Sequence, residues 1–456
     1  MRAFFADTIS CGRSGLNQLR LFATNVFWQY TATASAILAE FATIILVSRA
    51  LDVKAVGIMS FGYAFAFLVN QFFDIRSTEL VIKYLTDTLR DRDSATSVSW
   101  IWASFLAEII IRGGALITSL VAAWIGLSLG LLDTATAAIV GLSALVMYFN
   151  TMVTGPARGV LRVLRCFQWQ ALVTLICAML KVGFVYAALT LTEPKLTHVI
   201  AALALASLAT PLTYWLLTCR SIRKEIRPAA VLRLRLSEAR QAQPVRALVN
   251  FTKHQYITSL TMIPTKELDI NLLTSVAGFE VVGLYKIAKN VVSAMGSLPD
   301  AVFLVVYPEL ARYVARQAYT EMWAFLSRLT LIMGIGGICG YLIACLVFPE
   351  FAALVFGEEF RAASKYFNLL LLGFVVWTPL VWLNPLLLAA GRPEIISRGA
   401  VVGSVLVLLM YVILGKSLGV IGVAVATALA TPVVLGAIAI FAKRARVFAS
   451  LAAQSA

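Results

Sequence analysis

The sequence predicts an all-α polytopic membrane protein with about twelve transmembrane helices, and its composition and hydropathy both indicate this class. The 456 residues are 60% hydrophobic and only 13% charged, and the mean hydropathy is +0.87. Soluble domains are about half apolar and about a quarter charged. Apolar windows of span length recur along the whole chain, and about 20 apolar residues are enough to cross the hydrocarbon of a bilayer.

The predicted spans follow one another through short connections. Ahead of the first, Arg2, Arg13 and Arg20 stand among polar residues, which predicts a short amphipathic helix and not a cleavable signal. In chain order the spans cover residues 22–48, 55–73, 98–128, 134–155, 168–190, 197–218, 248–275, 281–307, 323–348, 366–390, 395–414 and 418–442.

The placement of the basic residues predicts the orientation of these spans. Most of the 38 Lys and Arg lie in alternate connections and in the two termini, which the positive-inside rule places in the cytoplasm. The net charge of +15 is therefore explained by topology and by attraction to anionic lipid, and we expect no nucleic-acid partner. The predicted outer loops hold only Arg49, Lys54, Lys195, Arg361, Lys365 and Lys416.

The sequence contains no pattern typical of a catalytic or metal site. It lacks the GxxxxGK[ST] phosphate loop, HExxH and GxSxG. The two histidines, His198 and His254, are predicted near opposite membrane faces, and the six cysteines show no CxxC spacing. We therefore expect no enzyme activity, no bound cofactor and no metal.

A basic segment divides the spans into two sets of six. We predict an N-terminal six-helix lobe at residues 1–218, a cytoplasmic linker at 219–247 and a C-terminal lobe at 248–456. Aligning Gly57 with Gly283 also brings Arg165 within one residue of Arg392. Two distant joints thus share one register, which predicts that the lobes are related by a pseudo-two-fold repeat, as transporters commonly are.

Ionisable residues inside predicted spans are candidate functional residues, because inserting one costs at least about 2.5–3.5 kcal/mol. Glu40 lies in the first span. Arg112 lies in the third, one turn after Glu108, and this order favours a pair within the helix. Lys181 lies in the fifth span without a local partner, so it needs an acid on another helix, a water-filled cavity or a ligand.

The seventh and eighth predicted spans are the richest in charge. Lys266, Glu267 and Asp269 precede the joint, and Lys286 and Lys289 follow it. A hairpin would bring acids and amines to a similar depth. Two readings stay open: an Asp269–Lys289 or Glu267–Lys286 bridge that locks the hairpin, and a polar cavity in which the pairs exchange partners or accept a proton.

Four stretches resemble the polysaccharide flippase family of the MOP superfamily. They are "SRALDVKAVGIMSFGYAF", "ELDINLLTSVAGFEVVGLYKIAKNVVSAMGSLPDAVFLVVYPELAR", "VFGEEFRAASKYFNLLLLGF" and "LLAAGRPEIISR". The second includes the acid, the G-x-Y turn and the exit proline of that family as Asp269, Gly283, Tyr285 and Pro308. The resemblance covers nearly the whole chain and is most specific between Glu267 and Arg398.

The resemblance implies a V-shaped bundle in the inner membrane that moves a polyprenyl-diphosphate-linked oligosaccharide to the outer leaflet by alternating access. Such substrates supply O-antigen of lipopolysaccharide, capsule or exopolysaccharide, together with a polymerase and chain-length machinery. H⁺ or Na⁺ would be the coupling ion. The expected substrate-binding cations are Lys181, Lys266, Lys286, Lys289 and Arg112, and the expected coupling or charge-pairing acids are Glu40, Asp269 and Glu267.

The chain also departs from the family pattern. Ile75 and Arg76 follow Asp74 where many members have Gly-Leu, and twelve spans are fewer than the fourteen of the lipid II flippase branch. The main rival is a cation-coupled multidrug or small-solute antiporter of the same superfamily. "LTDTLRDRDSATS" lacks the motif of major-facilitator transporters, and short predicted outer loops disfavour a membrane glycosyltransferase.

Overall fold

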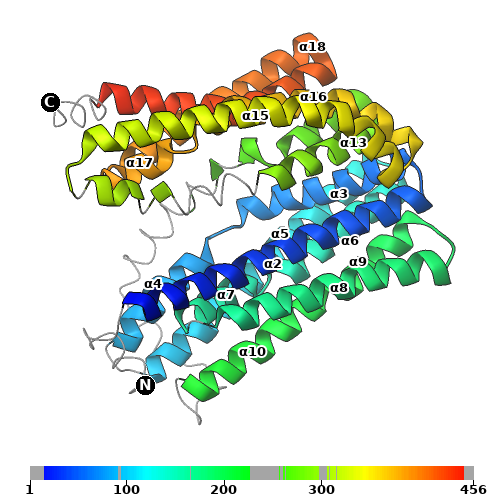
Figure 1. Ribbon diagram of the computed structural model, residues 1–456. Coiled ribbons are helices and arrows are strands. Elements are labelled where there is room, and N and C mark those ends of the chain that lie inside the picture. The colour runs from blue at the N-terminus through cyan, green and yellow to red at the C-terminus, as the bar shows by residue number, and fades with distance from the viewer. Residues whose placement is uncertain are drawn as a thin grey trace. The chain divides into compact units, whose positions relative to one another are not determined.

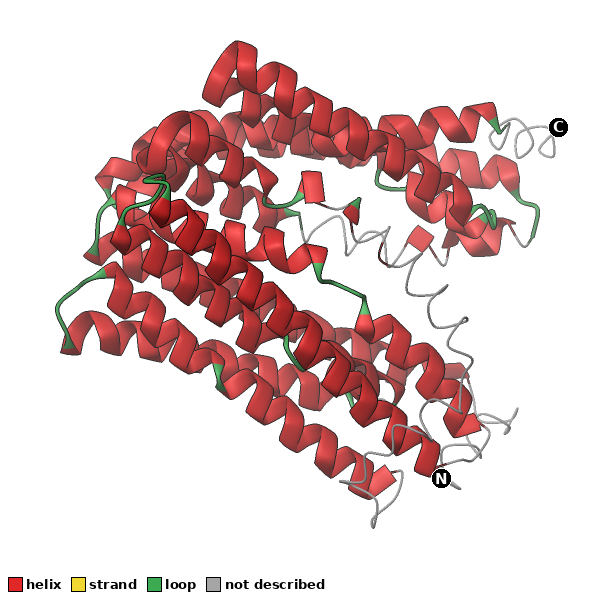
Figure 2. Ribbon diagram, turned by 180° about the vertical axis from the view of Figure 1, so that it is seen from behind, coloured by secondary structure: helices red, strands yellow, loops and turns green. Residues whose placement is uncertain are grey.

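The computed structural model describes residues 15–90, 94–164, 166–225, 256, 260–261, 263–296, 306–307, 309–314 and 316–445. Within these ranges every regular element is a helix (Figure 2). The predicted linker beyond residue 225, together with Arg165, His254 and Pro308, lies outside the described residues.

Figure 1 shows the helices of the described residues in two groups. The first group comprises α2 (Gly15–Ala50), α3 (Val53–Phe72), α4 (Ser77–Arg90), α5 (Ser94–Ser128), α6 (Thr134–Thr151), α7 (Thr154–Val163), α8 (Phe167–Leu191), α9 (Leu196–Ser207) and α10 (Ala209–Glu225). The second comprises η1 (Ile263–Thr265), α13 (Leu268–Met295), α15 (Tyr319–Phe356), η2 (Glu358–Ala363), α16 (Ser364–Trp377), η3 (Thr378–Leu380), α17 (Leu383–Ala389) and α18 (Pro393–Arg444).

The chain packs as two units, each with its own internal contacts. The first unit is Met1–Ala50 with Phe65–Leu260, and the second is Leu51–Ala64 with Thr261–Ala456. The start of α3 therefore packs with the second unit although it lies early in the sequence. The predicted lobes, at 1–218 and 248–456, remain a prediction about which parts of the chain move together.

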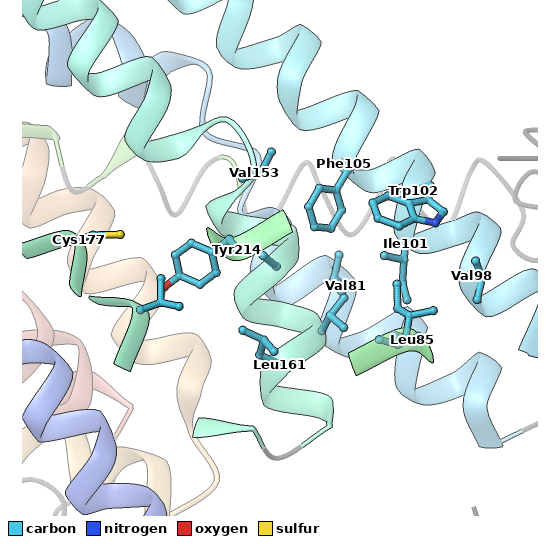
Figure 3. Close-up of a cluster of buried hydrophobic side chains, with 14 residues drawn as sticks. Val81, Leu85, Val98, Ile101, Trp102, Phe105, Val153, Leu161, Cys177 and Tyr214 are labelled. Carbon is cyan, nitrogen blue, oxygen red and sulfur yellow. The ribbon is translucent and has the colours of Figure 1, made fainter. Parts of the chain in front are cut away.

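In the first unit, α2 packs against α8, α5 against α6, and α9 against both α6 and α8. The shorter helices α4 and α7 pack against each other, and a cluster of apolar side chains joins them to α5 and α10 (Figure 3). Leu85, Ile101, Leu161 and Tyr214 belong to this cluster and are almost completely buried. This apolar core holds α4, α5, α7 and α10 against one another.

In the second unit, α13 and α18 each fold back on themselves. Non-helical backbone interrupts α13 at Gly278 (φ 76°) and α18 at Gly419 (φ 57°), in the left-handed region that favours glycine. Side chains 20 residues apart meet across α13 and side chains 16 residues apart meet across α18, so both are helical hairpins. The predicted joints between spans seven and eight and between eleven and twelve are thereby confirmed.

The described helices are those of a multi-pass membrane protein. Ten helical segments are long and apolar enough to cross a bilayer, and α18 counts as one of them although its hairpin contains two predicted spans. Ten to twelve spans therefore agree with the predicted number. Large apolar side chains stay exposed along these helices, with Leu346 and Leu354 on α15 more than three-quarters exposed, as a lipid-facing surface requires.

The backbones of α3 and the second limb of α13 approach closely at Gly57 and Gly283. A Cβ at Gly57 would lie 1.7 Å from the Phe279 carbonyl oxygen, and a Cβ at Gly283 would lie 2.3 Å from the Val53 carbonyl oxygen. Each glycine packs on the carbonyl one turn before the other glycine, so the contact is reciprocal. These are the two glycines that the sequence alignment places at equivalent positions, and a local two-fold relation between the segments would produce this contact.

We expect Gly57→Ala and Gly283→Ala to lower the thermal stability of the purified protein, because the added methyl meets backbone that cannot rotate away. Overpacking of this kind costs about 1–3 kcal/mol. Gly336→Ala on α15 is the matched control: nothing lies within 4 Å of its Cβ position, and alanine favours a helix by about 1 kcal/mol over glycine. Equal unfolding temperatures for all three variants would contradict the close approach.

Candidate functional site

Lys181 on α8 is held by neutral groups. Its Nζ donates to Asn150 Oδ1 on α6 at 2.8 Å, and Asn150 Nδ2 lies 3.4 Å from Ser207 Oγ on α9. Among the described residues no carboxylate lies within ion-pair distance of this ammonium. The sequence left open an acid, a cavity or a ligand as the partner of Lys181, and within the described part of the chain the acid is missing.

A second cation, Arg158 on α7, lies near Lys181 and is also held by a neutral group. Arg158 Nε donates to Tyr214 Oη at 3.4 Å, and its guanidinium lies 6.0 Å from the centre of that ring. Tyr214 follows Thr210 by one turn of α10, and Thr210 Oγ1 donates to Asn150 Oδ1 at 3.4 Å. Asn150, Thr210 and Tyr214 therefore connect two like charges.

Arg112 on α5 forms the pair with Glu108 that the sequence predicted, and a further pair that it did not. Arg112 Nε donates to Glu108 Oε1 at 2.9 Å, and Arg112 Nη2 donates to Asp74 Oδ1 at 2.8 Å. Its Nη1 donates to the Asn70 carbonyl at 3.1 Å. The Arg112 side chain is only 7% exposed. The guanidinium is thus enclosed by acceptors from α3, from the joint after α3, and from α5.

The charged residues of the α13 hairpin form the ion pairs that the sequence predicted. Lys289 Nζ lies 2.8 Å from Asp269 Oδ1 and 3.7 Å from Glu267 Oε2, and it also donates to the Lys266 carbonyl. Lys286 Nζ lies 3.4 Å from Glu267 Oε1. Lys289 therefore donates hydrogen bonds to two acceptors and has a second carboxylate at a longer distance, whereas Lys286 has one weak partner among the described residues.

Asp269 is completely buried, and both of its oxygens are bonded. Oδ1 faces Lys289, while Oδ2 accepts a 2.5 Å hydrogen bond from Tyr285 Oη and a 3.3 Å bond from Thr427 Oγ1. Tyr411 Oη lies 3.0 Å from Thr427 Oγ1. Asp269 thereby ties both limbs of α13 to the hairpin of α18.

The side chains of the remaining predicted site residues, Lys266 and Glu40, are exposed. Lys266 is exposed next to the start of α13, and Glu40 lies on the exposed face of α2. The proposed roles of the eight predicted residues in binding or coupling stay predictions. Among the described residues, Arg112 and Lys289 each contact two carboxylates, whereas Lys181 is held by a neutral group and Lys286 contacts one carboxylate.

Sequence reasoning missed the polar side chains that complete these sites. Asn150 and Tyr214 hold the cations of the first unit, and Thr427 and Tyr411 lie on α18, far along the chain from Asp269. Single polar residues in an apolar helix carry no pattern that assigns their partners. Asp74 did carry a signal, because an acid at the end of a span needs a counter-charge.

Comparison with known proteins supports a relation to transporters of glycans. The model of the family described as polysaccharide biosynthesis protein matches residues 22–314, more than half of the chain. The probable low-salt glycan biosynthesis flippase Agl15 of Haloferax volcanii is 26% identical over 187 residues, which are 40% of this chain. The matched region spans only 39% of that relative's length.

Solved structures show the fold. The lipid II flippase MurJ in an inward closed conformation matches 92% of this chain and 87% of its own, with a TM-score of 0.65 at 15% identity. An inward-facing multidrug resistance MATE transporter of the MOP superfamily matches 92% and 96% (TM-score 0.61, 15% identity). The Vibrio cholerae MATE transporter VcmN matches 95% and 98% (TM-score 0.60, 11% identity). The chain therefore has the MOP fold.

We expect Lys289→Met to destabilise the protein far more than Lys266→Met. Removing the Lys289 charge leaves the buried Asp269 carboxylate uncompensated, and breaking such a pair costs about 3–5 kcal/mol. Lys266 is exposed, so the same change there is a matched control. Thermal unfolding followed by tryptophan fluorescence measures the difference.

The double variant Asp269→Asn/Lys289→Met tests whether the loss comes from the orphaned charge. It removes both charges, so we expect it to recover much of the stability lost in Lys289→Met. If the double variant were less stable than Lys289→Met by the full cost of a second independent loss, the two side chains would not form an energetic pair.

Proposed function

We propose, from the premise that this chain belongs to the polysaccharide biosynthesis protein family, that it is a flippase for a lipid-linked oligosaccharide. The family is one of transporters, so the chain is not an enzyme. The named function of the Haloferax volcanii relative supports the same substrate class. The MOP fold is shared by glycolipid flippases and by drug antiporters, so the fold alone does not choose between them.

One observation carries the choice of an anionic substrate. Lys181 and Arg158 are both held at side chains of the same small polar group, Asn150, Thr210 and Tyr214, and among the described residues each has only neutral partners. Two such cations in a membrane protein are costly unless an anion neutralises them. A diphosphate has the charge and the acceptor oxygens to bridge an ammonium and a guanidinium. A cationic drug would be repelled by the same pair.

The remaining features of the proposal concern the transport cycle. The polar head of a polyprenyl-diphosphate-linked oligosaccharide would pass the cations while its lipid tail stays in the bilayer. Both termini would be cytoplasmic, and the lobes at 1–218 and 248–456 would rock in alternating access. The product would enter a surface glycan, such as O-antigen or exopolysaccharide, and a polymerase would consume it. H⁺ or Na⁺ would drive the cycle.

Deleting the gene for this protein should remove the surface glycan. The diphosphate-linked oligosaccharide should then accumulate in the inner (cytoplasmic) leaflet of the membrane. Extraction of lipid-linked oligosaccharides measures how much of this lipid accumulates. Labelling of intact cells with a reagent that does not cross the membrane measures how much of it has reached the outer leaflet. The chain reintroduced from a plasmid is the control and should restore both quantities. A normal glycan combined with altered drug tolerance would overturn the proposal and favour the antiporter.

Replacing Lys181 by Met should reduce flipping by about 10–100-fold, because a hydrogen bond to a charged group contributes about 1.5–3 kcal/mol. Thermal stability should not fall, since among the described residues no acid is left without its partner. The contrast with Lys289→Met separates a binding lysine from a structural one. Flipping is measured with reconstituted vesicles and a labelled lipid-linked oligosaccharide.

Lys416→Met is the matched control for Lys181→Met. Lys416 is an exposed lysine on α18 in the second unit, so the variant removes the same charge and leaves Lys181 and Arg158 unaltered. It should flip at the unaltered rate. Normal flipping by Lys181→Met, at a normal protein level in the vesicles, would rule out Lys181 as a substrate-binding residue.

A further inference from the structure

A buried carboxyl in the first unit has an oxygen without a hydrogen-bond partner. The Glu108 side chain is 1% exposed, and its Oε1 accepts the hydrogen bond from Arg112 Nε. Its Oε2 is buried and has no hydrogen-bond partner in the described part of the chain. An ionised carboxylate accepts at both oxygens, so a buried oxygen that accepts nothing is costly for the charged form.

The charge on this carboxyl is only partly compensated. Arg112 gives one hydrogen bond to Glu108 and one to Asp74, so a single guanidinium is shared by two carboxylates. Asp74 also accepts from the Arg76 backbone N–H at 3.2 Å. Two carboxylates that share one site are stabilised when one of them takes up a proton. The less solvated of the two is the natural acceptor, and Asp74 is 24% exposed.

Among the residues that the structure describes, Arg112 is the cation that contacts the Glu108 carboxyl. The groups that act on its carboxyl are Arg112, Ser77 and Asp74. From α4 it faces the Ser77 hydroxyl, and from α7 it faces Gly155. A Cβ at Gly155 would lie 2.0 Å from Ser77 Oγ and 3.4 Å from Glu108 Oε1. The glycine therefore allows α7 to close over the carboxyl, which the Ser77 hydroxyl faces from α4.

We propose that Glu108 is a proton-binding site: Oε2 takes a proton from water, and the carboxylate becomes a neutral carboxylic acid. Oε1 keeps its hydrogen bond from Arg112. Because Glu108 is then neutral, Asp74 is the ionised one of the two carboxyls that the guanidinium contacts. Loss of the proton restores the charge shared between the two acids. This site is separate from the acids of the α13 hairpin, which have lysine partners, and it does not rest on the proposed substrate.

Infrared spectroscopy of the full chain in lipid nanodiscs tests this proposal directly. The wild type should show the carbonyl stretch of a protonated carboxyl near neutral pH, where ordinary glutamates, with a pKa of about 4.3, are ionised. Labelling glutamate with ¹³C should shift this band, and labelling aspartate should leave it in place. The isotope experiment uses the unaltered protein, so it holds even if a variant fails to fold.

Glu108→Gln should abolish the band, and Glu280→Gln should retain it, since Glu280 is an exposed glutamate on α13. The proposal is overturned if the glutamate band is absent from the folded wild type across the neutral range, or if it persists in Glu108→Gln. No transported substrate enters this measurement. A protein that binds the proton but does not flip a glycolipid would therefore refute the proposed function and leave the proton site standing.

Discussion

The structure depends on one constraint, the neutralisation of ionisable side chains where no water can solvate them. Leaving a buried charge uncompensated in such surroundings costs about 3–5 kcal/mol. Asp269 illustrates the solution, because a lysine and a tyrosine from the second limb of α13 and a threonine from α18 converge on its two oxygens. The pairing that neutralises the acid also holds the α13 and α18 hairpins together.

Close packing of helices is the second requirement, and glycine supplies it where side chains would keep the backbones apart. Gly57 and Gly283 bring α3 and α13 into direct backbone contact, while Gly278 and Gly419 let two helices reverse within a single joint. Apolar packing between helices gains little in lipid, so small residues and polar contacts determine where the helices meet.

Seen together, the charged side chains divide according to how completely they are neutralised. Lys289 and Arg112 are enclosed by acceptors and act as structural ties between helices. Lys181 and Arg158 are held in position by neutral hydrogen bonds, which leaves their charge available to a ligand. Glu108 lies between these cases, since it shares the Arg112 guanidinium with Asp74 and one of its oxygens has no hydrogen-bond partner among the described residues. Substrate binding and protonation would thus occur in different parts of the first unit.

The sequence by itself determined the class of the protein, the approximate spans and the α13 hairpin, because hydropathy and local charge spacing are properties of short segments. It also indicated that Lys181 lacked a local partner and that Glu108 would pair with Arg112 one turn away. Tertiary structure alone decided that Asn150 holds Lys181, that Asp74 shares Arg112, and that Thr427 reaches Asp269. These partners lie on different helices. Packing across the whole unit decides which faces of two helices meet, and no local sequence pattern encodes that packing.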